Sequence, residues 1–523
     1  MNKPTSAPSS KDARRYRILL AVCLSGLAMP LSFTGPAMAL PTIAQQLGGS
    51  PIALNWVTNA FMLAFGSCLM AAGALADSYG RKRLFMIGVT GFIATSLALA
   101  FSPNIVWLDI LRAAQGVASA AAFAGGAPTL AQEFEGYERT RAFSMLGTTF
   151  GVGLAFGPIL SGLAIGHLGW RAVFHVVTAI CVIAFCLGWR YMNESRDPDA
   201  KGLDWPGALT FTAALTLFTY AVLQAPESGW HNTRIIGLLI ASALLMSVFV
   251  LIENRVKRPM LDLSLFRYPR FIGVQFLAAA PAYSYVVLLV LLPVRFIGIE
   301  GYSAMEAGRM MIALSGPMLV FPMLAGVLTR WMSPGLISGL GLLVSAVGLA
   351  WLAQCPPGTA SILLAVPLLL IGLGISFPWG LMDGLAVSVV PKERAGMAMG
   401  IFSTTRVAGE GVAQAIVAAL LAGLVQTRLH DISPEAAQRL AMGDLRQAMS
   451  LIQDANANGL IQGYGEAFHV LLYVLCGITT LTAVMVFGFL THSSSVVEHH
   501  MPSPSKPDRV VARAGGAVQK AAG

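Results

Sequence analysis

Long apolar blocks separated by short polar segments run through the whole 523-residue chain. A helix needs about 20 mainly apolar residues to cross a bilayer, and the blocks have about that length. Charged residues make up only 11% of the chain, against roughly 25% in soluble domains. We therefore predict an all-α polytopic membrane protein. The first block begins at Ile18, and the others lie near 52–76, 84–101, 105–130, 143–166, 170–190, 205–223, 234–252, 270–294, 305–329, 334–353, 360–388, 397–425 and 468–490.

Positive charge alternates from loop to loop. Lys and Arg collect in the cytoplasmic loops of membrane proteins. If all fourteen blocks span the membrane and the N-terminus lies inside, 25 of the 34 Lys and Arg residues fall on the cytoplasmic side. We therefore expect fourteen spans, both termini in the cytoplasm, and a place in a bacterial inner membrane. Six cations fall on the opposite side: Arg171, Arg234, Arg295, Arg428, Arg439 and Arg446.

The first block also has a feature of secretory signal peptides. Ala37, Met38 and Ala39 form an A-x-A pattern after a basic N-terminal segment. The block is nevertheless long enough to span a bilayer, and its removal would invert the distribution of positive charge. We expect it to be the first membrane helix.

A weak internal repeat divides the chain. Residues 138–147, before the fifth block, resemble residues 393–400, before the thirteenth. The two segments precede blocks that are eight apart in the chain. This separation is expected for two homologous six-helix bundles with two helices inserted between them, an arrangement found in transporters. The predicted parts are a cytoplasmic tail (1–17), an N-terminal bundle (18–190), a linker with two inserted helices (191–269), a C-terminal bundle (270–490) and a disordered cytoplasmic tail (491–523).

The segment 426–467 is predicted to be a periplasmic loop. Ser433, Pro434 and Glu435 suit the N-cap, the first position and the acidic first turn of a helix. We expect one short helix lying on the outer surface. Its apolar face would be formed by Leu440, Leu445, Met449 and Ile452.

A polar turn between the second and third blocks carries the densest charge. It reads Gly73-Ala-Leu-Ala-Asp77-Ser-Tyr-Gly80-Arg81-Lys82-Arg83. Its glycines allow a tight turn and close helix approach. Asp77 can pair with the cations or lie at a helix N-terminus. We expect a cytoplasmic turn whose polar contacts form and break as the adjoining helices move.

The fifth block combines closely spaced small residues with a proline. Small residues four apart let helices approach closely, and Pro158 removes one backbone hydrogen bond. We expect a helix that packs tightly and bends, although small-residue stripes also serve ordinary packing. The residues are Gly147, Gly151 and Ala155 on one stripe, Gly153, Gly157 and Ser161 on the next, and Gly162 after them.

Two opposite charges lie inside the thirteenth block. Arg406 and Glu410 are four residues apart and therefore share a helix face. Burial disfavours the charged form of a carboxyl group, whereas a neighbouring cation favours that charged form. Glu410 is therefore a candidate for proton coupling, and a fixed structural ion pair with Arg406 is the alternative.

Several of these segments together resemble the major facilitator superfamily, and within it the fourteen-span drug:proton antiporter group. The polar turn matches the superfamily's loop between helices 2 and 3, with Ser78 where a basic residue is usual. The fifth block matches the antiporter motif through Gly157-Pro158, with Ser161 replacing one glycine of a pair. The segments Leu111-Arg112-Ala-Ala-Gln115-Gly116 and Leu40-Pro41 with Trp56 match helix 4 and the helix 1–2 region.

The resemblance implies a role for Arg112 in proton coupling. Arg112 lies seven residues into its block, and Asp109, one turn away, is a candidate partner. Snorkelling to the interface or bracing of Asp109 are the alternatives. One departure from the group concerns substrate charge: relatives that export cationic drugs carry an acid in helix 1 where Ser32 lies here. A neutral or anionic substrate is therefore favoured.

Other polar and aromatic residues are weaker candidates. Asp383, Glu306, Arg309 and His175 are expected to be solvated or paired groups near helix ends. A substrate cavity could draw on Gln115, Phe377, Trp379, Tyr283 and Tyr285, although aromatic residues in spans mostly serve packing.

Other classes of protein are excluded or disfavoured. The chain has no Gly-Lys dipeptide and hence no P-loop for ATP. The six cysteines form no CxxC or Cys/His cluster, so neither a metal site nor a disulfide framework is predicted. The net charge of +9 lies in short loops and tails, which argues against nucleic-acid binding. We predict no enzymatic activity and no cofactor.

The sequence as a whole predicts a proton-coupled secondary transporter that works by alternating access. Export of a small organic compound by proton antiport is the first hypothesis. Uptake of a metabolite or vitamin, such as a riboflavin-like aromatic compound, is the alternative, and a transport-dead sensor or a channel is a third. The predicted partners are the lipid bilayer, the substrate and protons, and a periplasmic adaptor protein is left open.

Overall fold

The computed structural model describes residues 10–134, 136–196, 204–256, 259, 261, 263–390, 395–429, 432–452 and 456–491. These residues form helices and connecting turns, with no strand among them. The first residues of the predicted N-terminal tail, the predicted C-terminal tail after Thr491, and the repeat residues Glu393 and Arg394 lie outside the described residues.

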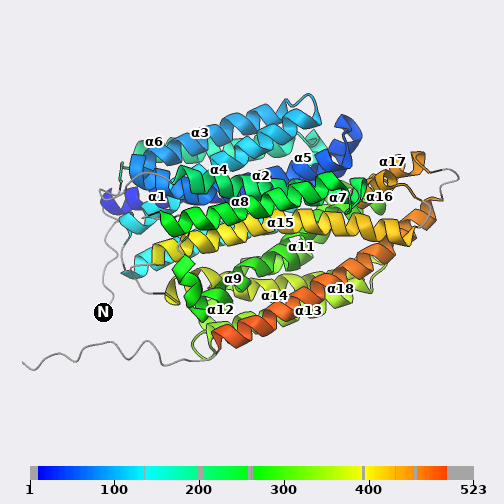
Figure 1. Ribbon diagram of the computed structural model, residues 1–523. Coiled ribbons are helices and arrows are strands. Elements are labelled where there is room, and N and C mark those ends of the chain that lie inside the picture. The colour runs from blue at the N-terminus through cyan, green and yellow to red at the C-terminus, as the bar shows by residue number, and fades with distance from the viewer. Residues whose placement is uncertain are drawn as a thin grey trace, which may run out of the picture. The chain divides into compact units, whose positions relative to one another are not determined.

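Six long helices form the N-terminal part, and two more follow them (Figure 1). The first six are α1 (Ser10–Leu47), α2 (Pro51–Tyr79), α3 (Arg81–Ala100), α4 (Ile105–Glu133), α5 (Gly136–Leu168) and α6 (Ala172–Tyr191). The two that follow are α7 (Trp205–Ser228) and α8 (Thr233–Arg255), after which comes the short 3-10 helix η1 (Leu263–Arg267).

The C-terminal part contains two broken spans and four continuous ones. The first broken span comprises α9 (Pro269–Pro281), η2 (Ala282–Val286), α10 (Leu288–Pro293) and η3 (Val294–Ile299), and the second comprises α11 (Ala304–Ser315), η4 (Gly316–Leu319) and α12 (Phe321–Leu328). The continuous spans are α13 (Pro334–Ala353), α14 (Ser361–Ser388), α15 (Ala395–Arg428) and α18 (Ala457–Leu490). Two short helices, α16 (Pro434–Ala441) and α17 (Leu445–Ser450), connect α15 to α18.

The predicted all-α membrane fold with fourteen spans is confirmed. Thirteen helical segments of the described chain are long and apolar enough to cross a bilayer, and α5, bent by 43°, makes the fourteenth. The block predicted at 270–294 is not one regular helix, because the π-helical segments η2 and η3 directly follow Pro281 and Pro293. A proline has no N–H to donate, and the backbone then shifts to the wider i→i+5 pattern.

The two ends of the helices are distinguished by side-chain contacts between elements. At the end where α1 begins, called the inner end here, Arg14 bonds to Glu133 of α4 and to the backbone oxygen of Tyr191 of α6. At the opposite, outer end, Trp170 donates a hydrogen bond to Gln46 at the end of α1.

The N-terminal and C-terminal parts meet through helix pairs in which glycine permits close approach. α2 packs against α15 and α5 packs against α11, while α7 covers both α2 and α15. The backbone of Ala408 lies against Gly66, so a Cβ atom at Gly66 would clash with it. At the outer end, a Cβ atom on Gly162 would lie 2.6 Å from the carbonyl oxygen of Ala304. Toward the inner end, by contrast, Gly73 faces open space.

The segment predicted as an outer loop at 426–467 is shorter and more buried than expected. α15 continues to Arg428, and α18 already begins at Ala457. The first turns of α18 are polar on one side, so the search for apolar blocks did not include them. Ser433 caps α16, but Gly443, with φ of 79°, ends the expected single helix and a second begins at Leu445. α16 does not lie on the surface, because five of its eight residues are buried against α15, α7 and α2.

Gly66→Ala should weaken the contact between α2 and α15. The added methyl group must displace the Ala408 backbone, and overpacking of this kind costs about 1–3 kcal/mol. We expect a lower melting temperature for the purified protein in detergent. Gly73→Ala, two turns along the same helix and facing open space, is the matched control and should melt no lower than the wild type, because alanine favours the helix. Equal melting temperatures for both variants would contradict the close contact.

Candidate functional site

A central cavity lies between the two parts of the molecule. It takes side chains from α1, α2 and α5 on one side and from η2, α14 and α15 on the other. Most of its wall is apolar and aromatic, and two charged groups, Arg406 and Glu410, reach it from α15. The lining residues are Met29, Pro30, Phe33, Phe61, Met62, Phe65, Phe150, Leu154, Val286, Trp379, Arg406, Val407 and Glu410.

Arg406 is paired with Asp383 of α14, not with Glu410. Its Nη1 lies 3.2 Å from Asp383 Oδ1. The guanidinium also lies 5.7 Å from the ring centre of Trp379 and 5.4 Å from that of Phe402, within range for cation–π attraction. The i, i+4 spacing placed Arg406 and Glu410 on one face, but tertiary packing supplied a better partner from the next helix.

Glu410 is buried without a hydrogen bond or ion pair to any other described residue. Its side chain is 7% exposed, and the Arg406 guanidinium acts on it only by longer-range attraction. Burying an unpaired charge costs several kcal/mol. A proton or a hydrogen-bonding group of a bound compound would remove that cost. The geometry therefore allows Glu410 to exchange one for the other.

Arg112 is fully buried inside the N-terminal bundle, away from the central cavity. It donates from Nε to the Val57 carbonyl oxygen at 2.8 Å and from Nη1 to Gln115 Oε1 at 2.5 Å. Its guanidinium also lies 4.4 Å from the ring centre of Phe61. The expected partner Asp109 makes no ion pair with it, and Asp109 Oδ1 is buried without a hydrogen bond in the described structure. Backbone and amide groups hold Arg112 instead.

Of the five residues predicted as candidates for a substrate cavity, one lines the central cavity and four have other contacts. Trp379 lines the central cavity. Gln115 bonds to Ser96 within the N-terminal bundle, and Tyr283 bonds to Thr482 of α18. Tyr285 bonds to Ser315. Phe377 packs against Phe321 of α12, with ring centres 5.9 Å apart.

The two small-residue stripes of α5 serve different partners. Gly153 and Gly157 lie against Pro30 and Thr34 of α1 in the same half. On the other stripe, Gly151 and Gly162 lie against backbone oxygens of the C-terminal half, those of Met318 and Ala304, while Gly147 faces open space. The 43° bend lies between Leu154 and Phe156, where the ring of Pro158 excludes the hydrogen bond to the Leu154 carbonyl. α5 thus packs closely against α1 on one stripe, and on the other stripe its glycines lie against the backbone of the C-terminal half.

The polar turn after α2 is tied to the end of α6. Asp77, in the last turn of α2, forms an ion pair with Arg81 at 2.8 Å. Of the two predicted partners of Asp77, the cations are therefore the correct one, and not a helix N-terminus. Gly80, with φ of 117°, makes the turn into α3. Lys82 Nζ donates to the backbone oxygen of Met192, and Glu194 accepts from the backbone N–H groups of Lys82 and Arg83.

The remaining weak candidates lie near helix ends. Glu306 closes a capping box with Ser303 at the start of α11, and Arg309 lies on the exposed side of the same helix. His175 bonds to the backbone oxygen of Arg171 in the first turn of α6. Arg295, counted as a loop cation, is instead buried in η3, where it pairs with Glu300 at 2.6 Å.

Sequence reasoning did not assign a role to Gln414. It lies one turn beyond Glu410 on α15 and donates a hydrogen bond to the Val286 backbone oxygen at 3.1 Å. The signal available in the sequence was that Gln414 lies four residues after Glu410 and therefore on the same helix face as this buried acid.

A helical protein with fourteen spans and a partly polar cavity between two sets of helices is a membrane carrier. The chain belongs to the Major Facilitator Superfamily, whose family model matches residues 20–414. The protein is therefore an integral membrane transporter of small molecules and not an enzyme.

Individual relatives and solved structures are consistent with this membership. The chain is 30% identical to the puromycin resistance protein pur8 of Streptomyces alboniger over 97% of both chains. It is 28% identical to the tetracenomycin C resistance and export protein of Streptomyces glaucescens, over 87% of this chain and 85% of that one. Its fold resembles a peptide transporter POT structure, with a TM-score of 0.58, 14% identity and coverage of 90% and 95% of the two chains.

Arg406→Gln and Asp383→Asn should show coupled effects on stability. The two side chains touch, but Asp383 is 41% exposed, so solvent weakens the pair. We expect a coupling of about 0.5–1 kcal/mol in a double-mutant cycle of unfolding free energies. The measurement is denaturant unfolding of the purified protein in detergent, and additive effects would rule out the pair.

Proposed function

We propose that this protein exports small organic compounds across a bacterial inner membrane in exchange for protons, with both termini in the cytoplasm. The observation that carries the proposal is Glu410, which lies buried at the wall of a cavity formed by both halves and makes no hydrogen bond or ion pair with another described residue. The names of the relatives, which include a resistance and export protein, favour export over uptake.

Glu410 is the proposed proton site, and Arg406 with Asp383 is proposed to set its electrostatic surroundings. A proton entering from the outside would neutralise Glu410 and release the compound. Return of the cavity to the inside would discharge the proton and admit the next compound. The charge at the cavity wall thus changes with each step, and the free energy of the proton gradient drives the compound outward.

The conformational change is proposed to be a rocking of residues 18–190 against residues 270–490. Within the 191–269 linker, α7 packs against both halves and α8 packs against α7. α5 is proposed to slide on α11 because Gly151 and Gly162 bring its backbone against backbone oxygens of the other half. The Asp77–Arg81 turn is proposed as part of the inner gate. Arg112 and Asp109 are proposed to support coupling from within the N-terminal bundle, since neither lines the central cavity. A periplasmic adaptor protein forms no part of the proposal.

Glu410→Gln should strongly reduce proton-driven transport without abolishing binding. Glutamine keeps the size and polarity of the side chain but cannot gain or lose a proton. In inside-out vesicles with an imposed pH gradient, we expect accumulation of puromycin or tetracenomycin C to fall at least about fivefold, the lower range of coupling between two ligands. Glu306→Gln is the control, because glutamine also completes the capping box at this position. Undiminished proton-driven accumulation by Glu410→Gln would remove Glu410 from the mechanism, and accumulation only in right-side-out vesicles would indicate uptake.

Asp77→Asn should slow the transport cycle without changing the choice of compound. The variant loses a half-exposed ion pair worth up to about 1 kcal/mol, so turnover should fall by up to about fivefold. The measurement is the initial rate for the same two compounds in proteoliposomes. Arg83→Gln, in the same turn but with an Arg83 side chain that is 74% exposed, should behave like the wild type. A changed ratio of the two rates would contradict a gating role.

A further inference from the structure

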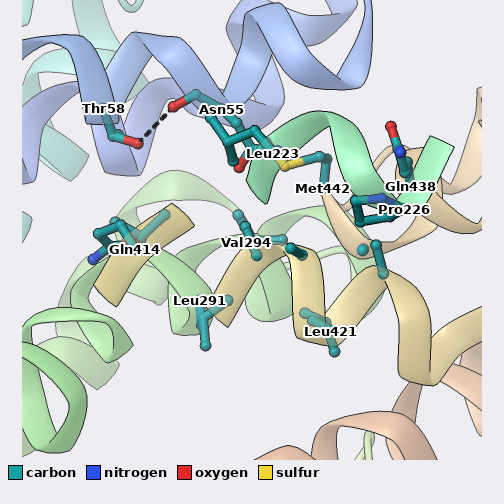
Figure 2. A pocket seen from close by; sticks show the side chains of 15 residues that line it. Asn55, Thr58, Leu223, Pro226, Leu291, Val294, Gln414, Leu421, Gln438 and Met442 are labelled. Atoms are coloured by element: carbon teal, nitrogen blue, oxygen red, sulfur yellow. Dashed lines mark hydrogen bonds between the residues drawn. The ribbon is translucent and has the colours of Figure 1, made fainter. Parts of the chain in front are cut away.

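A second cavity lies at the outer end of the seam between the halves (Figure 2). Its 15 lining residues come from α2, α7, α10, η3, α15 and α16. None of the 15 is charged, and four are polar: Asn55, Thr58, Gln414 and Gln438. The cavity therefore differs in chemistry from the central one, where Arg406 and Glu410 reach the wall.

Gln438 is the unexplained polar group of this outer cavity. Its side chain is 4% exposed, and neither Nε2 nor Oε1 has a hydrogen-bond partner in the described structure. The other three polar residues each donate a hydrogen bond to a nearby backbone oxygen: Asn55 to Pro51, Thr58 to Asn55 and Gln414 to Val286. A buried amide with both of its groups unpaired is unfavourable and rare in native proteins. A bound group that both donates and accepts hydrogen bonds would satisfy it.

A single hydrogen bond from α15 marks the boundary between the two cavities. Gln414 lines the outer cavity and bonds to the backbone oxygen of Val286, a residue that lines the central cavity. Gln414 also follows Glu410 by one turn of α15. The outer cavity is thus the next space beyond the proposed proton site in the outward direction.

α16 forms part of the wall of this outer cavity. The helix contributes Gln438 and Ala441 to the wall, and Met442, which follows its last residue, also lines the cavity. Arg439, next to Gln438, donates a hydrogen bond to the Gly49 backbone oxygen at 2.8 Å, which ties α16 to the turn between α1 and α2. Because α16 bears on both halves, a change in their spacing at the outer end alters the wall that carries Gln438.

We propose that the outer cavity is a second binding site on the export path, in which Gln438 binds the uncharged, hydrogen-bonding part of the compound before release. The cavity measures about 30 Å³ in this conformation, so a compound reaches Gln438 only when the halves separate at the outer end. The site then suits an amphipathic molecule that presents a carbonyl acceptor and a hydroxyl or amide donor to Gln438 and an apolar ring to the remaining wall. This inference rests on the proposed export function and adds a stage to it.

The test is transport of tetracenomycin C, which gives its name to the export protein to which this chain is similar, by the full-length protein in proteoliposomes. Gln438→Leu should raise the KM by roughly three- to tenfold, the value of one or two neutral hydrogen bonds. The melting temperature should stay equal or rise, because leucine removes an amide that has no partner in the protein. A higher KM without loss of stability is therefore specific to ligand binding.

A control variant separates the possible outcomes. Gln447→Leu, the same substitution on α17 and outside the cavity, should retain the wild-type KM. An unchanged KM for Gln438→Leu, or an equal rise for Gln447→Leu, would overturn the second site while leaving export intact. A wild-type protein that transports neither tetracenomycin C nor puromycin would instead remove the proposed function, and the second site with it.

Discussion

The cost of placing charge in an apolar medium organises the inside of this transporter. Inside the membrane, every polar group needs a partner within the protein. Arg112 meets most of this requirement with a backbone oxygen, an amide and an aromatic ring, although its Nη2 has no hydrogen bond in the described structure; Arg295 meets it with Glu300. Glu410 makes no hydrogen bond or ion pair with another described residue. It is the one acid among the residues that line the central cavity, so a proton or a bound compound can supply the missing contact there.

Close packing by small residues determines how the two halves can move. Gly153 and Gly157 of α5 lie against α1, so these two helices pack closely within one half. Gly162 and Gly151 of α5 lie against backbone atoms of α11 and η4 in the other half. Where glycine meets backbone, few specific side-chain contacts have to break when the helices shift, whereas the close packing within each half would have to be broken to change it.

The fold was predictable from the sequence, and the site was predictable only in part. Apolar length and the alternation of positive charge are local properties, and they predicted fourteen spans correctly. The partners of charged residues depend on which helices meet. For this reason spacing along α15 suggested Glu410 for Arg406, whereas packing against α14 supplied Asp383. The burial of α16 was missed for the same reason, because its alanine-rich face gives no hydropathy signal and only the assembled seam shows what it covers.

The tight seam between α5 and α11 has a consequence for inhibition. Gly162 and Gly308 lie against the backbone of the opposite helix, with room for little more than a hydrogen atom. A compound that occupied the central cavity and pushed a rigid substituent into this seam would hold the helices apart at their outer end. Such a wedge would arrest the pump by blocking closure, without competing for hydrogen bonds with the transported molecule. Because backbone atoms form the opposing wall, side-chain mutations there would offer few routes to escape it.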